Sequence, residues 1–123
     1  MKNVICWFEI PMADFERGVK FYSTILGEEI QVAEHMGQKM GFFPMSEKEG
    51  VGGALVPAGN GNAPSKTGTR VYLTCEGKLD EVISKVEPAG GKITQPRMSI
   101  GEYGFIAFME DTEGNIVGLH SSK

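Results

Sequence analysis

The chain has 123 residues, a net charge of −4, 41% hydrophobic residues and 23% charged residues. This length fits one domain, or two small halves that share a core. The negative charge and the absence of a Lys/Arg cluster argue against a nucleic-acid partner, and no apolar run approaches the ~20 residues of a membrane span. The N-terminal residues lack the pattern of a secretory leader, so we expect a cytoplasmic protein with its two cysteines reduced.

Residues 7–27 predict a strand, a tight turn and a capped helix. Apolar and polar residues alternate up to Met12, which is the period of a strand with one face on a core. Asp14 is then a good N-cap, because its carboxylate can accept the free N–H groups of the first helical turn. Gly27 stands where a left-handed C-cap residue belongs. The predicted apolar stripe of this helix consists of Phe15, Val19, Tyr22 and Leu26.

The remaining chain predicts strands at 28–34, 39–45 and 51–56, followed by a Gly/Pro/Asn-rich linker at 58–68. The pattern then begins again. It predicts a strand at 69–75, a helix at 79–86, and strands at 92–95, 105–110 and 116–120. A flexible loop is expected at 98–104. We therefore divide the chain into module one (1–57), the linker (58–68) and module two (69–123).

The two modules align with each other at a nearly constant offset. Gly27 matches Gly91 at 64 residues (91 − 27), and Ala54 matches Gly118 at the same offset (118 − 54). The strands before the helices fit better at 63, where Phe8 meets Val71 (71 − 8). An internal duplication explains this best, while chance similarity of two amphipathic helices stays open as the alternative.

Two segments of the chain resemble one protein family. The sequence FEIPMADFERGVKFYSTILG at 8–27 and the sequence FMEDTEGNIVGLHSS at 108–122 are similar to the vicinal oxygen chelate superfamily. That group includes lactoylglutathione lyase (glyoxalase), bleomycin-resistance proteins and extradiol dioxygenases. The resemblance implies an α+β fold, in which two tandem βαβββ modules with mixed sheets surround a shared cleft, commonly in a homodimer.

The resemblance also indicates where a divalent metal ion would be held in members that use one. Carried over to this chain, the four ligand positions are occupied by Trp7, Ala54, Arg70 and Gly118. None of these can bind a hard cation, because Trp and Ala offer no lone pair and Arg stays protonated. We therefore expect no metal at the usual position, and a divalent ion only through unorthodox ligands.

Alternation places a chemically varied set of side chains on the predicted cleft. Glu9 and His120 are the candidate acid and base, and Arg70 is the candidate anion clamp. Trp7 and Tyr72 are further candidates for contact with a ligand, and so is Tyr103, which lies on the flexible loop that could close over the mouth of the pocket. Gly53, Ala54 and Gly118 are expected to leave open room in the cleft.

Each of these residues also has an ordinary structural interpretation. Glu9 can form a buried ion pair with Arg70, His120 can be a solvated strand end, and Trp7 can belong to the core. The favoured hypothesis is a small-molecule binding protein. A metal-dependent lyase or isomerase related to lactoylglutathione lyase, using Glu9 and His120, is the first alternative, and a non-catalytic dimeric interaction module is the second.

Overall fold

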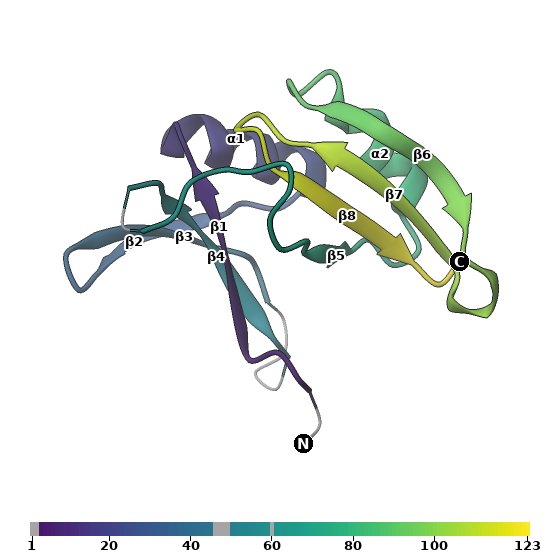
Figure 1. The fold of residues 1–123 in the computed structure, drawn as a ribbon, viewed down its shortest axis with the longest axis horizontal. Helices are drawn as coiled ribbons and strands as arrows, with labels where there is room; N and C mark the ends of the chain where they lie inside the picture. Colours follow the sequence, from purple (N-terminus) through teal and green to yellow (C-terminus); the bar gives the residue numbers. More distant parts are fainter. Residues whose placement is uncertain (1–2, 46–49, 60) are drawn as a thin grey trace.

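The computed structural model describes residues 3–45, 50–59 and 61–123, and it contains two four-stranded mixed sheets and two α-helices (Figure 1). The first half of the chain supplies β1 (Trp7–Met12), α1 (Phe15–Leu26), β2 (Gln31–His35), β3 (Gln38–Phe42) and β4 (Gly52–Pro57). The second half supplies β5 (Tyr72–Thr74), α2 (Leu79–Val86), β6 (Lys92–Ser99), the short 3₁₀ helix Gly101–Tyr103, β7 (Phe105–Glu110) and β8 (Ile116–Ser121). The predicted βαβββ order thus occurs twice.

Both sheets have the same topology. The strand orders are β1-β4-β3-β2 and β5-β8-β7-β6, with the first pair of each parallel and the rest antiparallel. The strand registers also repeat, since Glu9 pairs with Ala54 and Tyr72 pairs with Gly118. These pairs differ by the offsets seen in the sequence, 63 for the first strands (72 − 9) and 64 for the last (118 − 54). The fold therefore confirms the predicted α+β architecture of two tandem modules.

Helix α1 begins and ends where its caps predict. The Asp14 carboxylate accepts the Arg17 backbone N–H at 3.1 Å, and Gly27 is left-handed at φ 70°. Its buried face is wider than the predicted stripe, in which Val19 and Leu26 are only half-buried. The residues that the helix buries are Phe15, Gly18, Phe21, Tyr22 and Ile25. The face is wide because α1 packs on sheet A, the sheet of β1–β4, and also meets α2 and the β7–β8 turn.

The predicted ends of the strands in module two need correction. Strand β6 continues to Ser99, although the sequence predicted a strand only to residue 95 and a loop at 98–104. Two register shifts against β7 explain this, because a bulged edge strand tolerates Pro96 without losing its pairing. Strand β5 is shorter than predicted, with only Tyr72–Thr74 in the ladder.

A buried polar cluster on the β7–β8 turn joins the two modules. Asp111 accepts the Tyr22 hydroxyl at 2.7 Å, and the Asn115 side chain donates to the Pro11 carbonyl at 2.9 Å. Glu113 accepts Arg17 Nε at 2.7 Å and the Asp14 backbone N–H at 2.6 Å. Since Pro11, Asp14, Arg17 and Tyr22 belong to module one, this cluster fixes one module against the other. The boundaries of the linker and the two modules stay predictions.

No helix in the described part of the chain is both long enough and apolar enough to cross a membrane.

Candidate functional site

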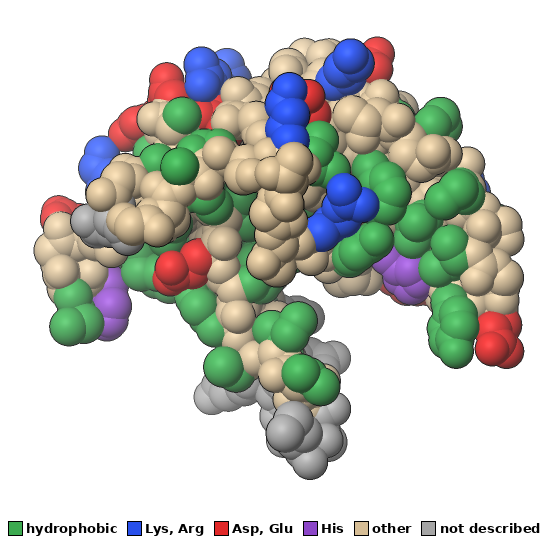
Figure 2. Space-filling view, in the orientation of Figure 1, with side chains coloured by type: hydrophobic (Ala, Val, Ile, Leu, Met, Phe, Trp, Pro, Cys, Tyr) green, Lys and Arg blue, Asp and Glu red, His purple; other side chains and the backbone are tan. Residues whose placement is uncertain are grey.

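A cleft of about 970 Å³ lies along the junction of the two modules. Its sides are β1 and β5, which are the edge strands of their sheets and do not pair with each other in the described chain. Figure 2 shows hydrophobic side chains reaching the surface along the lower part of β1 and over sheet B, the sheet of β5–β8. Four of the predicted site residues line this cleft: Trp7, Glu9, Arg70 and Tyr72.

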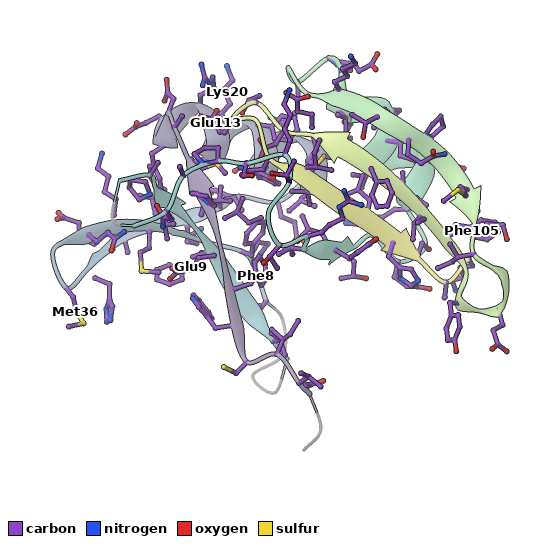
Figure 3. The ribbon with its side chains drawn as sticks, in the orientation of Figure 1. Phe8, Glu9, Lys20, Met36, Phe105 and Glu113 are labelled. Carbon is purple, nitrogen blue, oxygen red and sulfur yellow. The ribbon has the colours of Figure 1, made fainter. Side chains whose placement is uncertain are left out.

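The module-one wall is built on Trp7, whose side chain is 42% exposed and so is not simply core. The Trp7 ring packs on Phe42 with centroids 6.2 Å apart and lies beside Gly52, its cross-strand partner. Trp7 Nε1 donates to Glu9 Oε2 at 3.2 Å. Figure 3 shows Glu9 and Phe8 leaving β1 on opposite sides. Phe8 packs against the core, and Glu9 is exposed.

The module-two wall is built on Phe108. The Arg70 guanidinium carbon lies 4.4 Å from the centre of the Phe108 ring, and the Tyr72 ring meets Phe108 edge-on at 5.9 Å. No ion pair involves Arg70 within the described residues, so the predicted structural bridge from Glu9 to Arg70 is not formed there. Arg70 therefore presents an exposed cation held against an aromatic ring.

The two walls occupy duplicated positions. Trp7 and Arg70 are equivalent at the offset of 63 (70 − 7), and their ring partners are equivalent as well. Phe42 pairs with Ala54 in one module as Phe108 pairs with Gly118 in the other. Sequence reasoning missed Phe42 and Phe108, although the alignment of the modules was a signal that could have found them.

His120 and Tyr103 lie elsewhere. The His120 ring nitrogen Nε2 is 2.7 Å from the Tyr103 backbone oxygen, so the two residues contact each other at the loop between β6 and β7. Neither is among the described residues that line the cleft, and the Tyr103 side chain is 70% exposed. The structure thus places four of the six candidates in one cleft. The other two lie away from it, Tyr103 at the end of the 3₁₀ helix and His120 in contact with it.

The open room expected near the small residues is filled. A Cβ atom at Gly118 would overlap the Tyr72 ring, and a Cβ atom at Gly53 would overlap the Phe8 ring. Ala54 is fully buried. That expectation was wrong because each glycine sits directly across from an aromatic residue, and the aromatic ring lies over the space without a side chain.

The side chains at the four positions where metal-using members of the superfamily hold their ion can now be compared with what a metal ion needs. Of the four carried-over positions, Trp7 offers an indole, Ala54 a methyl group and Arg70 a guanidinium, and Gly118 lies under the Tyr72 ring. None of these groups has a lone pair suited to a divalent cation. The residues present therefore do not fit a metal ion held in the family's manner, and we derive no step through one.

The sequence matches the glyoxalase/bleomycin resistance protein/dioxygenase superfamily over residues 4–119. The chain belongs to this superfamily. This confirms the resemblance on which the fold was predicted.

Three known proteins are similar to the chain in sequence or in structure. The chain is 27% identical over 115 residues to a putative glyoxylase, CFP32, of Mycobacterium tuberculosis, a match that covers 92% of this chain and 43% of the relative. The chain thus spans less than half the length of that curated relative. A glyoxalase/bleomycin resistance protein from Albidiferax ferrireducens has a similar structure, with TM-score 0.75, 15% identity and coverage of 97% and 98% of the two chains. The fosfomycin resistance protein FosX of Listeria monocytogenes gives TM-score 0.70, 14% identity and coverage of 100% and 96%.

Proposed function

We propose that this protein binds a small organic anion with a flat apolar body in the cleft between its modules, without a metal ion at the family's usual position. Arg70 holds the anionic group, and Trp7 and Tyr72 provide the flat walls. The observation that carries the proposal is the Arg70 guanidinium, which is exposed in the cleft, stacked on Phe108 and free of an acidic partner among the described residues.

The proposal does not use an acid–base pair of Glu9 and His120. The His120 ring already contacts the Tyr103 carbonyl, and His120 is not among the described residues lining the cleft. The positions of Glu9 and His120 therefore do not support the lyase or isomerase alternative, in which these two residues would act together.

Trp7 is the only tryptophan, so its fluorescence reports directly on the cleft. We expect 4-methylbenzoate to change the Trp7 emission in a saturable way. Replacing Arg70→Met removes the charge while keeping an apolar chain over Phe108, and should weaken binding about tenfold or more, as expected for the loss of a charge-assisted hydrogen bond.

Arg97→Met is the matched control. Arg97 also stacks on a phenylalanine, 4.0 Å from the centre of Phe105, but it pairs with Asp80 outside the cleft. This variant should bind like the parent. Equal weakening in both variants, or an emission that never responds to the ligand, would contradict the proposal.

We further propose that the protein is a homodimer, in keeping with its superfamily. Several large apolar side chains are exposed outside the residues that line the cleft, including Val32 at 51% and Met36 at 93%. Light scattering after gel filtration should give about twice the chain mass of 13.4 kDa. A single-chain mass at every concentration would refute this proposal.

A cytoplasmic location is the third part of the proposal. Both cysteines are unpaired in the structure, Cys6 exposed and Cys75 buried, which suits a reducing compartment. Fractionation of cells that express the intact protein would test the location, and recovery outside the cytoplasm would contradict it.

A further inference from the structure

We infer that the ligand of the cleft is a zwitterion, with a carboxylate that contacts Arg70 and an ammonium group that contacts Glu9 at the opposite end of a flat apolar body. This inference rests on the proposed binding function and specifies its ligand class. It is based on the opposite charges of the two walls, which are acidic on module one and basic on module two. In both modules the wall includes a phenylalanine at the equivalent position, Phe42 in one and Phe108 in the other.

The module-one wall is acidic. Glu9 is exposed, and only its Oε2 atom accepts a hydrogen bond within the described residues, from Trp7 Nε1. The other carboxylate oxygen, Oε1, stays available to a donor. Glu28, a second carboxylate from the same module, also lines the cleft.

The module-two wall is basic. Arg70 is held by its ring contact with Phe108, and no ion pair in the described chain uses its guanidinium. Lys78, at the start of α2, also lines the cleft and takes part in no ion pair among the described residues. One cleft therefore has two carboxylates on one module and two cations on the other.

A ligand that fills the cleft but carries only one charge would take the charge of the other wall partly out of water without a partner, which is unfavourable. A ligand with both charges supplies a partner to each wall. Glu9 and Arg70 form no ion pair with each other, since no nitrogen of Arg70 lies within 4.0 Å of a Glu9 carboxylate oxygen. Both charges are therefore available to a ligand.

Matched benzene derivatives test this inference on the intact protein. The anion is 4-methylbenzoate, the cation is 4-methylbenzylamine, and the zwitterions are 4-(aminomethyl)benzoate and its longer homologue 4-(3-aminopropyl)benzoate. Calorimetry and Trp7 emission should show the better zwitterion binding about tenfold more tightly than the anion, and more tightly still than the cation.

Two variants assign the ends of the ligand. Glu9→Gln keeps an acceptor for Trp7 Nε1 but removes the charge, so the zwitterion should then bind no better than 4-methylbenzoate. Glu16→Gln, which removes an exposed carboxylate paired with Lys39 outside the cleft, should keep the full preference.

The outcomes separate the two claims. If 4-methylbenzoate binds as tightly as both zwitterions, the inference is overturned while the proposed anion-binding function stands. If the preference survives Glu9→Gln, the assignment of the ammonium group to Glu9 is wrong. If none of the four compounds binds, the proposed function itself fails.

Discussion

Glu113, in the β7–β8 turn, accepts hydrogen bonds from the start of α1. Its side chain is fully buried, yet it carries a charge that meets Arg17 at 2.7 Å. Burial by itself raises the pKa of Glu113, but the hydrogen bonds from Arg17, the Asp14 backbone and Thr112, together with the Arg17 charge, outweigh it. The pKa of Glu113 is therefore lowered in the folded protein.

A lowered folded-state pKa makes this contact sensitive to acid. The stabilisation is complete above the unfolded-state pKa of a glutamate, about 4.3, and is lost as the pH falls through the lower folded-state value. Glu113→Gln should cost about 1–2 kcal/mol of unfolding free energy at pH 7. It should also make stability depend less on pH below about 4.3. Urea unfolding across this pH range measures both effects, and a variant with the parent's stability and acid profile would contradict the role of Glu113.

The two cysteines should differ in reactivity. Burial raises the pKa of the Cys75 thiol to about 11, so almost no reactive thiolate is present near neutral pH, and the residue has no exposed surface. Cys6 is exposed. A thiol-reactive dye should therefore label one site rapidly in the folded protein and a second only after denaturation. Rapid labelling of folded Cys6→Ser would show that Cys75 is accessible.

At the scale of secondary structure, cross-strand pairs of glycine and an aromatic residue shape the walls of the cleft. Tyr72 lies over Gly118 and meets Phe108, which in turn supports Arg70. The position of the glycine therefore determines where the aromatic ring can lie. Its role is steric, because the missing side chain makes room for the ring and not for a ligand.

Gly118→Ala should displace the Tyr72 ring. We expect a loss of about 1–3 kcal/mol in unfolding free energy, as for overpacking in a filled core, together with weaker binding of 4-methylbenzoate. Gly68→Ala is a suitable control, because its new Cβ would make only ordinary contacts with Ser65. Combining Gly118→Ala with Tyr72→Ala should recover part of the stability. No destabilisation by Gly118→Ala would show that the ring can move aside at no cost.

Features that depend on neighbouring residues in the chain could be predicted from the sequence. Asp14 and Gly27 fix the ends of α1 through local hydrogen bonds and backbone conformation, and both were identified from residue type. The extent of β6 could not be predicted in this way, because its bulges depend on pairing with β7. The filled space at Gly118 was missed for the same reason, since it depends on the partner across the ladder.

At the scale of the whole molecule, one buried core and one polar cluster join the duplicated halves. The core includes Ile10 and Phe21 from module one and Leu73 and Leu119 from module two. The sequence predicted the duplication and placed Trp7, Glu9, Arg70 and Tyr72 on a common cleft, because strand alternation is regular. It did not predict the contact that holds His120, which depends on the path of the loop between β6 and β7.

The central proposal is that the cleft binds an organic anion through Arg70 without the help of a metal ion. The most direct test is calorimetric titration of 4-methylbenzoate into protein stripped with EDTA, repeated after adding excess Ni²⁺ or Mn²⁺. We predict the same dissociation constant in both states and a value at least about tenfold higher for Arg70→Met. Binding that appears only after the metal is restored, or that is unchanged in Arg70→Met, would show that Arg70 does not hold the anion by itself.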